Sequence, residues 1–155
     1  MNKTVFITGG SRGIGAWAVS EFTRLGYNVA FTYLNSKDRA EALEKSCGAF
    51  GIVADASKSD DVNRAVFLAT EKFGKIDILI NNAGIDEFAL FTDITDEMWH
   101  RMIDTNLSSA FYASRAVLPQ MISRKEGVII NVSSMWGQIG ASCEVHYSVS
   151  KAGML

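Results

Sequence analysis

The strongest constraint on the fold is the regular alternation of apolar, β-prone segments with segments of helical spacing. The apolar segments cover residues 4–8, 27–33, 49–54, 76–81 and 127–133, and segments of helical periodicity lie between them. Strands that alternate with helices form a parallel sheet with helices on both faces, and strands buried on both faces are continuously apolar. The pattern therefore predicts an α/β fold with a doubly wound parallel sheet.

Length, charge and cysteine content narrow the class of protein. The 155 residues predict a single domain, residues 1–155. The net charge is −2 without a long run of one sign, which argues against nucleic acid or an anionic membrane as the main partner. Cys47 and Cys143 lack the spacing of metal ligands. No apolar run resembles a signal peptide or a membrane span, so we expect a cytoplasmic protein.

The first strand runs into the glycine-rich turn TGGSRGIG, residues 8–15, which opens a helical segment. Glycine lets the backbone approach a ligand closely, and the amides at a helix N-terminus favour an anion. This strand, turn and helix together predict a seat for the pyrophosphate of a dinucleotide. A tight turn without a ligand is the alternative.

The end of the second strand indicates which dinucleotide is bound. NAD sites place an acidic residue there, but here the nearest one, Asp38, comes several positions late. Arg12 lies in the glycine turn, and Asn35, Ser36 and Lys37 follow the strand. Two cations and several donors suit a 2′-phosphate, so NADP (NADPH) is favoured over NAD. The alternative is that both cations are merely solvated.

Near the end of the chain, Tyr147 and Lys151 are four positions apart. On a helix they would share one face. A nearby ammonium stabilises a phenolate, which makes a tyrosine a usable proton donor nearer neutral pH. The spacing alone is common by chance, so the pair gains meaning only from the other motifs.

Five motifs occur in one order: TGGSRGIG at 8–15, NNAG at 81–84, Asn106, Ser134, and YSVSK at 147–151. In this order the chain resembles the short-chain dehydrogenase/reductase family over its whole length. The resemblance implies a Rossmann-like parallel sheet with five strands in the order 3-2-1-4-5. It also implies an oxidoreductase that transfers hydride between NADPH and a carbonyl substrate.

The resemblance implies a catalytic set of four residues. Tyr147 would protonate the carbonyl oxygen, and Ser134 would bond that oxygen and orient the substrate. We prefer Ser134 to Ser133 because it stands thirteen residues before Tyr147, which is the usual spacing of these two residues in the family. Lys151 would support the tyrosine and hold the nicotinamide ribose, and Asn106 would fix a water molecule in a proton relay.

The resemblance also implies cofactor contacts in three segments: the glycine turn, the end of the third strand and the end of the fourth. Besides Asn35, Ser36, Lys37, Tyr147 and Lys151, the expected contacts are Gly9, Ser11, Arg12, Gly13, Ile14, Gly15, Asp55, Asn81, Ala83 and Gly84.

Within the family, the chain looks most like the 3-oxoacyl-[acyl-carrier-protein] reductase group, which implies a substrate carried on acyl-carrier protein. Residues 133–153 resemble instead the elongation factor P 5-aminopentanone reductases. Glu144 would then meet a cationic substrate group, or it is a surface carboxylate. We expect His146 to be neutral and exposed.

Family members usually continue well beyond the position of Leu155, with two further strands, a substrate-covering segment and much of the subunit interface. The resemblance therefore implies that this is the N-terminal part of a longer enzyme, a homotetramer or dimer. The alternative is a truncated nucleotide-binding fragment without turnover.

Overall fold

The computed structural model describes residues 2–155 and contains a five-stranded, all-parallel sheet. The strand order β3-β2-β1-β4-β5 is the predicted one. The strands are β1 (Thr4–Ile7), β2 (Asn28–Tyr33), β3 (Phe50–Val53), β4 (Ile78–Asn81) and β5 (Val128–Asn131). Because all five run the same way, their carboxyl ends meet at one end of the sheet, where α/β proteins bind ligands.

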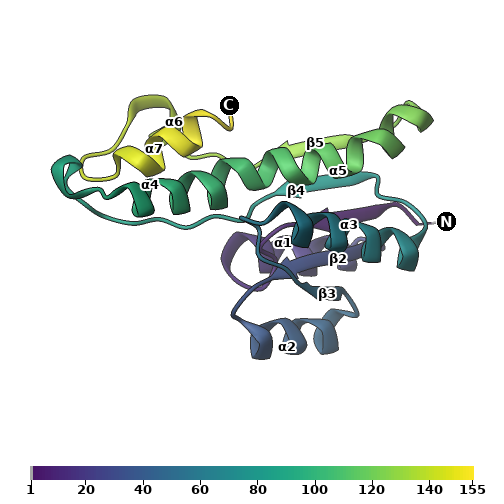
Figure 1. Ribbon diagram of the computed structural model, residues 1–155. Coiled ribbons are helices and arrows are strands. Elements are labelled where there is room, and N and C mark those ends of the chain that lie inside the picture. The colour runs from purple at the N-terminus through teal and green to yellow at the C-terminus, as the bar shows by residue number, and fades with distance from the viewer. Residues whose placement is uncertain (1) are drawn as a thin grey trace.

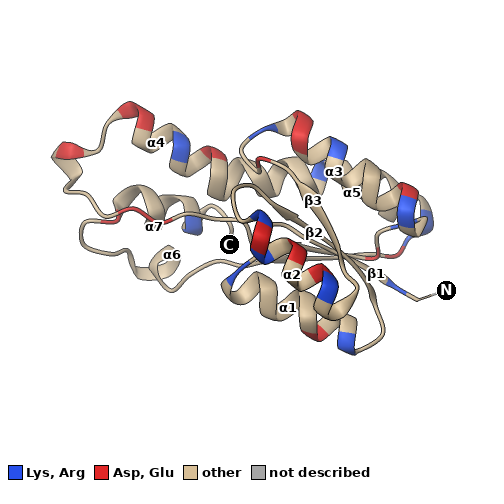
Figure 2. Ribbon diagram, turned by 90° about the horizontal axis from the view of Figure 1, so that it is seen from below, with Lys and Arg blue, Asp and Glu red and all other residues tan. Residues whose placement is uncertain are grey.

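Helices cover both faces of the sheet, which confirms the doubly wound prediction (Figure 2). Phe6 packs with α3 and α5 on one face, whereas Val5 and Ile7 pack with α1 and α2 on the other, because successive strand side chains point to opposite faces. The helices are α1 (Gly13–Arg24), α2 (Lys37–Cys47), α3 (Ser59–Phe73), α4 (Asp96–Ile103), α5 (Ser109–Arg124), α6 (Trp136–Ile139) and α7 (Val145–Ala152), with a 3₁₀ turn η1 (Phe91–Asp93).

The helical segment before β5 is continuous from α4 to α5 but changes its winding in the middle. Thr95 begins it, its side-chain oxygen accepting a bond of 3.2 Å from the Met98 amide. Between the two α-helices lies the π-helical turn η2 (Asp104–Ser108). Such turns inside α-helices are frequent at functional sites, and Asn106 lies in this one.

The last segment of the chain lies beyond the carboxyl ends of the strands. Figure 1 shows α7 there beside α4, and α6 packs against α7. The loop before α4 is tied to the loop before α7 by a bond of 2.8 Å from the Ala89 amide to the Cys143 carbonyl. Within residues 2–155, no helix combines the length and the apolar character that crossing a membrane requires.

Candidate active site

The glycine turn is packed tightly against the end of β4. Gly9 has φ +68°, and a Cβ atom there would lie 2.9 Å from Ala83 Cα. A Cβ on Gly15 would lie 2.3 Å from the Gly9 carbonyl oxygen. The side-chain nitrogen Nδ2 of Asn82 donates hydrogen bonds of 3.0 Å to the backbone carbonyls of Thr8 and Gly9. Only glycine fits at these two positions, so the turn has the close backbone approach that a dinucleotide seat requires.

A cleft of about 870 Å³ extends from this turn across the carboxyl ends of the strands. Residues of the three predicted segments and of the loop after β2 line it. Its volume is within the size range of cofactor sites. The predicted contacts that line it are Gly9, Ser11, Arg12, Gly13, Ile14, Asn35, Ser36, Asp55, Ala83 and Gly84. The other predicted contacts, which do not line it, are Gly15, Lys37, Asn81, Tyr147 and Lys151.

The fourth strand places Asn82, not Asn81, at the cleft. The Asn81 side chain is buried and donates to Asn131 Oδ1 at 2.9 Å and to Ser114 Oγ at 3.3 Å, toward α5. Successive side chains leave a strand on opposite sides, so only one of the two asparagines can face the cleft. The sequence reasoning selected Asn81 and did not select Asn82.

After β2, too, a residue other than the predicted one lines the cleft. Lys37 forms an ion pair with Glu41 at 3.7 Å, and its side chain is 73% exposed. Arg39, which the sequence reasoning did not select, lines the cleft instead. Two positions along a helix are about 200° apart around its axis, so Lys37 and Arg39 cannot both face the cleft. Had the first residue of α2 been known from the sequence, Lys37 and Arg39 would have been recognised as lying on different faces of this helix.

Lys151 is buried next to the cleft but does not line it. Its ammonium nitrogen donates to the Val132 carbonyl at 2.8 Å and lies 5.9 Å from the centre of the Tyr147 ring. A Cβ atom on Gly84, which lines the cleft, would be 3.5 Å from the same nitrogen. Removal from water disfavours the charged amine, so burial lowers the pKa of Lys151.

Asn106 joins three segments around this lysine. Its Oδ1 accepts from the Ile85 amide at 2.8 Å, and its Nδ2 donates to the Ile85 carbonyl at 2.8 Å and to Ser150 Oγ at 3.0 Å. The π-helical turn aims this fully buried side chain at both the loop after β4 and helix α7. Asn106 therefore positions Gly84 and Lys151 relative to each other.

Both candidate serines already bond to the protein. Ser133 Oγ donates to the Lys151 carbonyl at 2.7 Å, and Ser134 Oγ accepts from the Trp136 amide at 3.2 Å. Ser133 thus holds the backbone of α7. The Ser134 hydroxyl keeps its proton for another acceptor, so the preference for Ser134 as the substrate-binding serine stays a prediction.

The family model of short chain dehydrogenases matches residues 3–155, nearly the whole chain. The chain belongs to the short-chain dehydrogenase family. The fold, the glycine turn and the Tyr147–Lys151 helix of this family member are those that the five sequence motifs predicted.

Three curated relatives illustrate the match. The protein is similar to the 3-oxoacyl-[acyl-carrier-protein] reductase FabG of Staphylococcus epidermidis, with 38% identity over 100% of this chain and 66% of that protein. The same enzyme of Staphylococcus aureus is 36% identical over 65% of its length. The acetoacetyl-CoA reductase of Rhizobium meliloti is 37% identical over 64% of its length. The chain thus spans slightly less than two thirds of these relatives.

In this short-chain dehydrogenase, the expectation of an exposed His146 is wrong. The ring is fully buried, and neither nitrogen has a hydrogen-bond partner among the described residues. His146 stands four positions before Ser150, whose hydroxyl bonds to Asn106, so both share the inner face of α7. The inner face of α7 packs against α4 and η2, and this burial could not be seen from the sequence.

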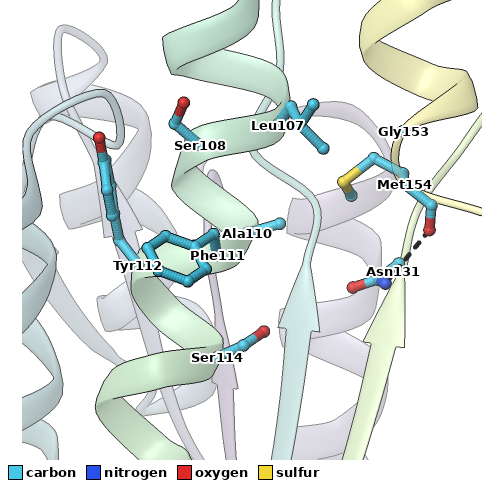
Figure 3. Close-up of a pocket in the computed structure, with 9 residues that line it drawn as sticks. All are labelled: Leu107, Ser108, Ala110, Phe111, Tyr112, Ser114, Asn131, Gly153 and Met154. Carbon is cyan, nitrogen blue, oxygen red and sulfur yellow. Dashed lines mark hydrogen bonds between the residues drawn. The ribbon is translucent and has the colours of Figure 1, made fainter.

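A second hollow of about 480 Å³ lies between α5, β5 and the end of α7 (Figure 3). Asn131 donates to the Met154 carbonyl at 3.3 Å in this hollow, and the rings of Phe111 and Tyr112 lie along its α5 side. It shares no lining residue with the dinucleotide cleft and contains none of the predicted site residues.

Proposed function

We propose that the whole protein is an NADPH-dependent oxidoreductase that reduces a ketone to a secondary alcohol, in the manner of a 3-oxoacyl-[acyl-carrier-protein] reductase. The observation that carries this proposal is the place of the buried Lys151 ammonium. It lies 5.9 Å from the centre of the Tyr147 ring and next to Gly84, which lines the dinucleotide cleft. The glycine turn, closed against β4, supports the binding of a dinucleotide at the other end of this cleft.

Each residue of the site has a distinct task. A nicotinamide cofactor bound in the cleft would supply the hydride. The Tyr147 hydroxyl donates its proton to the carbonyl oxygen, and the Lys151 ammonium stabilises the phenolate that is left. The Ser134 hydroxyl donates a hydrogen bond to the same oxygen and orients the substrate. Asn106 fixes the loop after β4 and helix α7 relative to each other through its bonds to Ile85 and Ser150.

The choice of NADP rests on the charges at the adenosine end of the cleft. Arg12 lines the cleft, and no acidic residue follows β2 before Asp38. Asp55, which also lines it, accepts bonds from the Ser57 amide at 2.9 Å and hydroxyl at 2.7 Å. The Asp55 carboxylate thus accepts hydrogen bonds from its own loop, and the Arg12 guanidinium remains available to bind a phosphate.

The substrate is proposed from the relatives' names and from the loop before α7. A 3-oxoacyl chain on acyl-carrier protein is the first candidate, because similar proteins are named for that reaction. A 5-aminopentanone group on elongation factor P is the second. Glu144 favours it, since this carboxylate directly precedes the helix of Tyr147 and suits an amine. Turnover of a 3-oxoacyl thioester and of an amino ketone by the whole protein separates the two.

A homodimer or homotetramer is proposed for the whole protein. Phe111, Leu118 and Ile122 are exposed on one face of α5, at spacings of seven and four residues. An apolar stripe of this kind suits packing against a second helix. A monomeric mass in light scattering would contradict this part of the proposal.

Exchange of Tyr147 for phenylalanine tests the function. Tyr147→Phe removes only the hydroxyl, so turnover of the whole protein with NADPH should fall by about 10²–10⁴-fold, the usual contribution of a general acid. The dissociation constant of NADPH, measured by fluorescence titration, should stay within about twofold of the wild type. Tyr112→Phe, on α5 away from the cleft, is the matched control. Equal turnover by both variants would refute the role of Tyr147.

A further inference from the structure

The charges of this chain are divided unevenly between two parts of the molecule. Residues 85–108 and 132–155, which contain α4, η2, α6 and α7, have seven aspartates and glutamates and two basic side chains, Arg101 and Lys151. The rest of the chain has ten aspartates and glutamates and thirteen lysines and arginines. The net charge of −2 therefore combines an acidic end, beyond the carboxyl ends of the strands, with a basic remainder (Figure 2).

Neither basic residue neutralises the loops at this end. The Arg101 guanidinium is 2.5 Å from the Glu87 carboxylate, and the buried Lys151 ammonium donates to the Val132 carbonyl. Five other carboxylates, on the loops and on the first turn of α4, take part in no ion pair among residues 2–155. This acidic face consists of Asp86, Asp93, Asp96 and Glu97, which are exposed, and Glu144, which is half-buried.

Stabilisation of a helix accounts for only part of the acidic face. Asp96 and Glu97 lie in the first turn of α4, where the helix dipole favours carboxylates. Asp86 and Asp93 lie outside the α-helices, and among residues 2–155 no lysine or arginine pairs with them. Their charges therefore remain available to a partner molecule.

Large apolar side chains are exposed at the same end of the molecule. Phe88 and Phe91, in the loop before α4, are 74% and 71% exposed, and Ile139, the last residue of α6, is 73% exposed. The loops before α4 and before α7 are joined through the bond from the Ala89 amide to the Cys143 carbonyl, and both α4 and α6 pack against α7. Exposed apolar side chains with polar groups around them mark interaction sites.

The acidic face adjoins the entrance of the proposed active site. Asp86 lines the dinucleotide cleft, and Glu144 directly precedes the helix that contains Tyr147. In the proposed function the ketone is carried on a protein. A carrier that delivers its ketone to Tyr147 therefore has to approach these charges and the apolar side chains beside them.

We propose that this end of the molecule is the docking surface for a basic carrier protein, one that presents lysine or arginine side chains beside its ketone group. The inference rests on the proposed reduction of a carrier-bound ketone and specifies the charge of that carrier. Opposite charges steer two proteins together and raise the association rate by about 10–10³-fold, whereas like charges exclude wrong partners. The exposed phenylalanines provide the apolar contacts of such an interface.

The probes are peptides of equal length, each with the same 4-oxopentanoyl group on one lysine. Their other residues are mainly lysines, glutamates or serines, so the peptides differ chiefly in charge. Fluorescence anisotropy measures the dissociation constant of each peptide for the whole protein, and NADPH oxidation measures its turnover. At low ionic strength the lysine-rich peptide should bind about tenfold or more tightly than the glutamate-rich peptide, with the serine-rich peptide between them. In about 1 M NaCl, where the Debye length is about 3 Å, this preference should fall below about twofold.

Charge reversal at Asp93 and Glu97 tests the location of the surface. Asp93→Lys with Glu97→Lys should abolish or reverse the preference for the lysine-rich peptide. Turnover of free ethyl 3-oxobutanoate should stay within about twofold of the wild type, because neither residue lines the cleft. The matched control is Asp60→Lys with Glu71→Lys on α3, where Asp60 is likewise an exposed acid in the first turn of a helix. The control should bind all the peptides like the wild type, and circular dichroism verifies that both variants are folded.

The outcomes separate this inference from the function on which it rests. Equal binding of the lysine-rich and glutamate-rich peptides by the wild type, or tighter binding of the glutamate-rich peptide, would overturn the docking surface. A preference that survives the exchange of Asp93 and Glu97, or that the control on α3 also loses, would overturn its assignment to this end of the molecule. If the wild type shows the expected preference but reduces no ketone, free or peptide-bound, the proposed function fails and the docking surface is retained.

Discussion

Replacement of Asn106 by alanine tests how the structure assembles the site. This side chain is fully buried and joins the loop after β4, through Ile85, to helix α7, through Ser150. Alanine retains none of these bonds. Because this loop carries Gly84 and this helix carries Lys151, their loosening should impair folding and catalysis together.

The cost can be worked out from the contacts. Three hydrogen bonds to Ile85 and Ser150 are lost, and each contributes about 1 kcal/mol, so Asn106→Ala should lower the free energy of unfolding by about 3 kcal/mol. Unfolding free energies of whole domains are about 5–15 kcal/mol, so this is a large fraction. A domain of this size loses about 2–4 °C in melting temperature per kcal/mol, which predicts a drop of about 6–12 °C.

Urea denaturation followed by circular dichroism measures this loss. Asn63→Ala is the matched control, because Asn63 is exposed on α3 and makes one long bond, 3.4 Å, to Ser59. That variant should stay within about 0.5 kcal/mol of the wild type. If Asn106→Ala is no less stable than Asn63→Ala, the view that Asn106 holds the three segments together is refuted.

Two further predictions concern the glycine turn and the opposite end of the sheet. Gly15→Ala should abolish dinucleotide binding in fluorescence titrations, because its methyl group would meet the Gly9 carbonyl at 2.3 Å. A Cβ atom on Gly13 would meet no atom within 4 Å, but this residue has φ +53°. Gly13→Ala should therefore cost only about 1–2 kcal/mol of stability. Equal effects of the two substitutions on dinucleotide binding would contradict this reasoning. Burial raises the pKa of Asp77, but the bonds from Lys75 and the Thr4 amide outweigh it and hold the pKa below the usual 3.8. The carboxylate therefore stabilises the fold fully above about pH 4 and progressively less as the pH falls. Asp77→Asn should cost about 3 kcal/mol at pH 7 in urea denaturation, and this cost should shrink as the pH is lowered below about 4. A cost independent of pH would exclude this role for the charge.

Local sequence patterns were sufficient to predict the parallel sheet. The alternation of apolar runs and helical segments predicts parallel strands, and parallel strands place their carboxyl ends together. Glycines at 9 and 15 have a local cause in close backbone contacts. The spacing of Tyr147 and Lys151 depends only on the helical repeat, so their common helix was predictable as well.

Tertiary structure alone decided which of two neighbouring residues faces the cleft or the core. Asn81 turns to α5 and Asn82 to the cleft, Lys37 turns outward and Arg39 inward, and His146 is buried. The direction of a side chain depends on the residue at which its strand or helix begins and on what packs against each face. A shift of one residue in a strand reverses every side chain, and the sequence does not specify that starting point. The residue types of this protein's site were therefore determined locally, and their directions by packing.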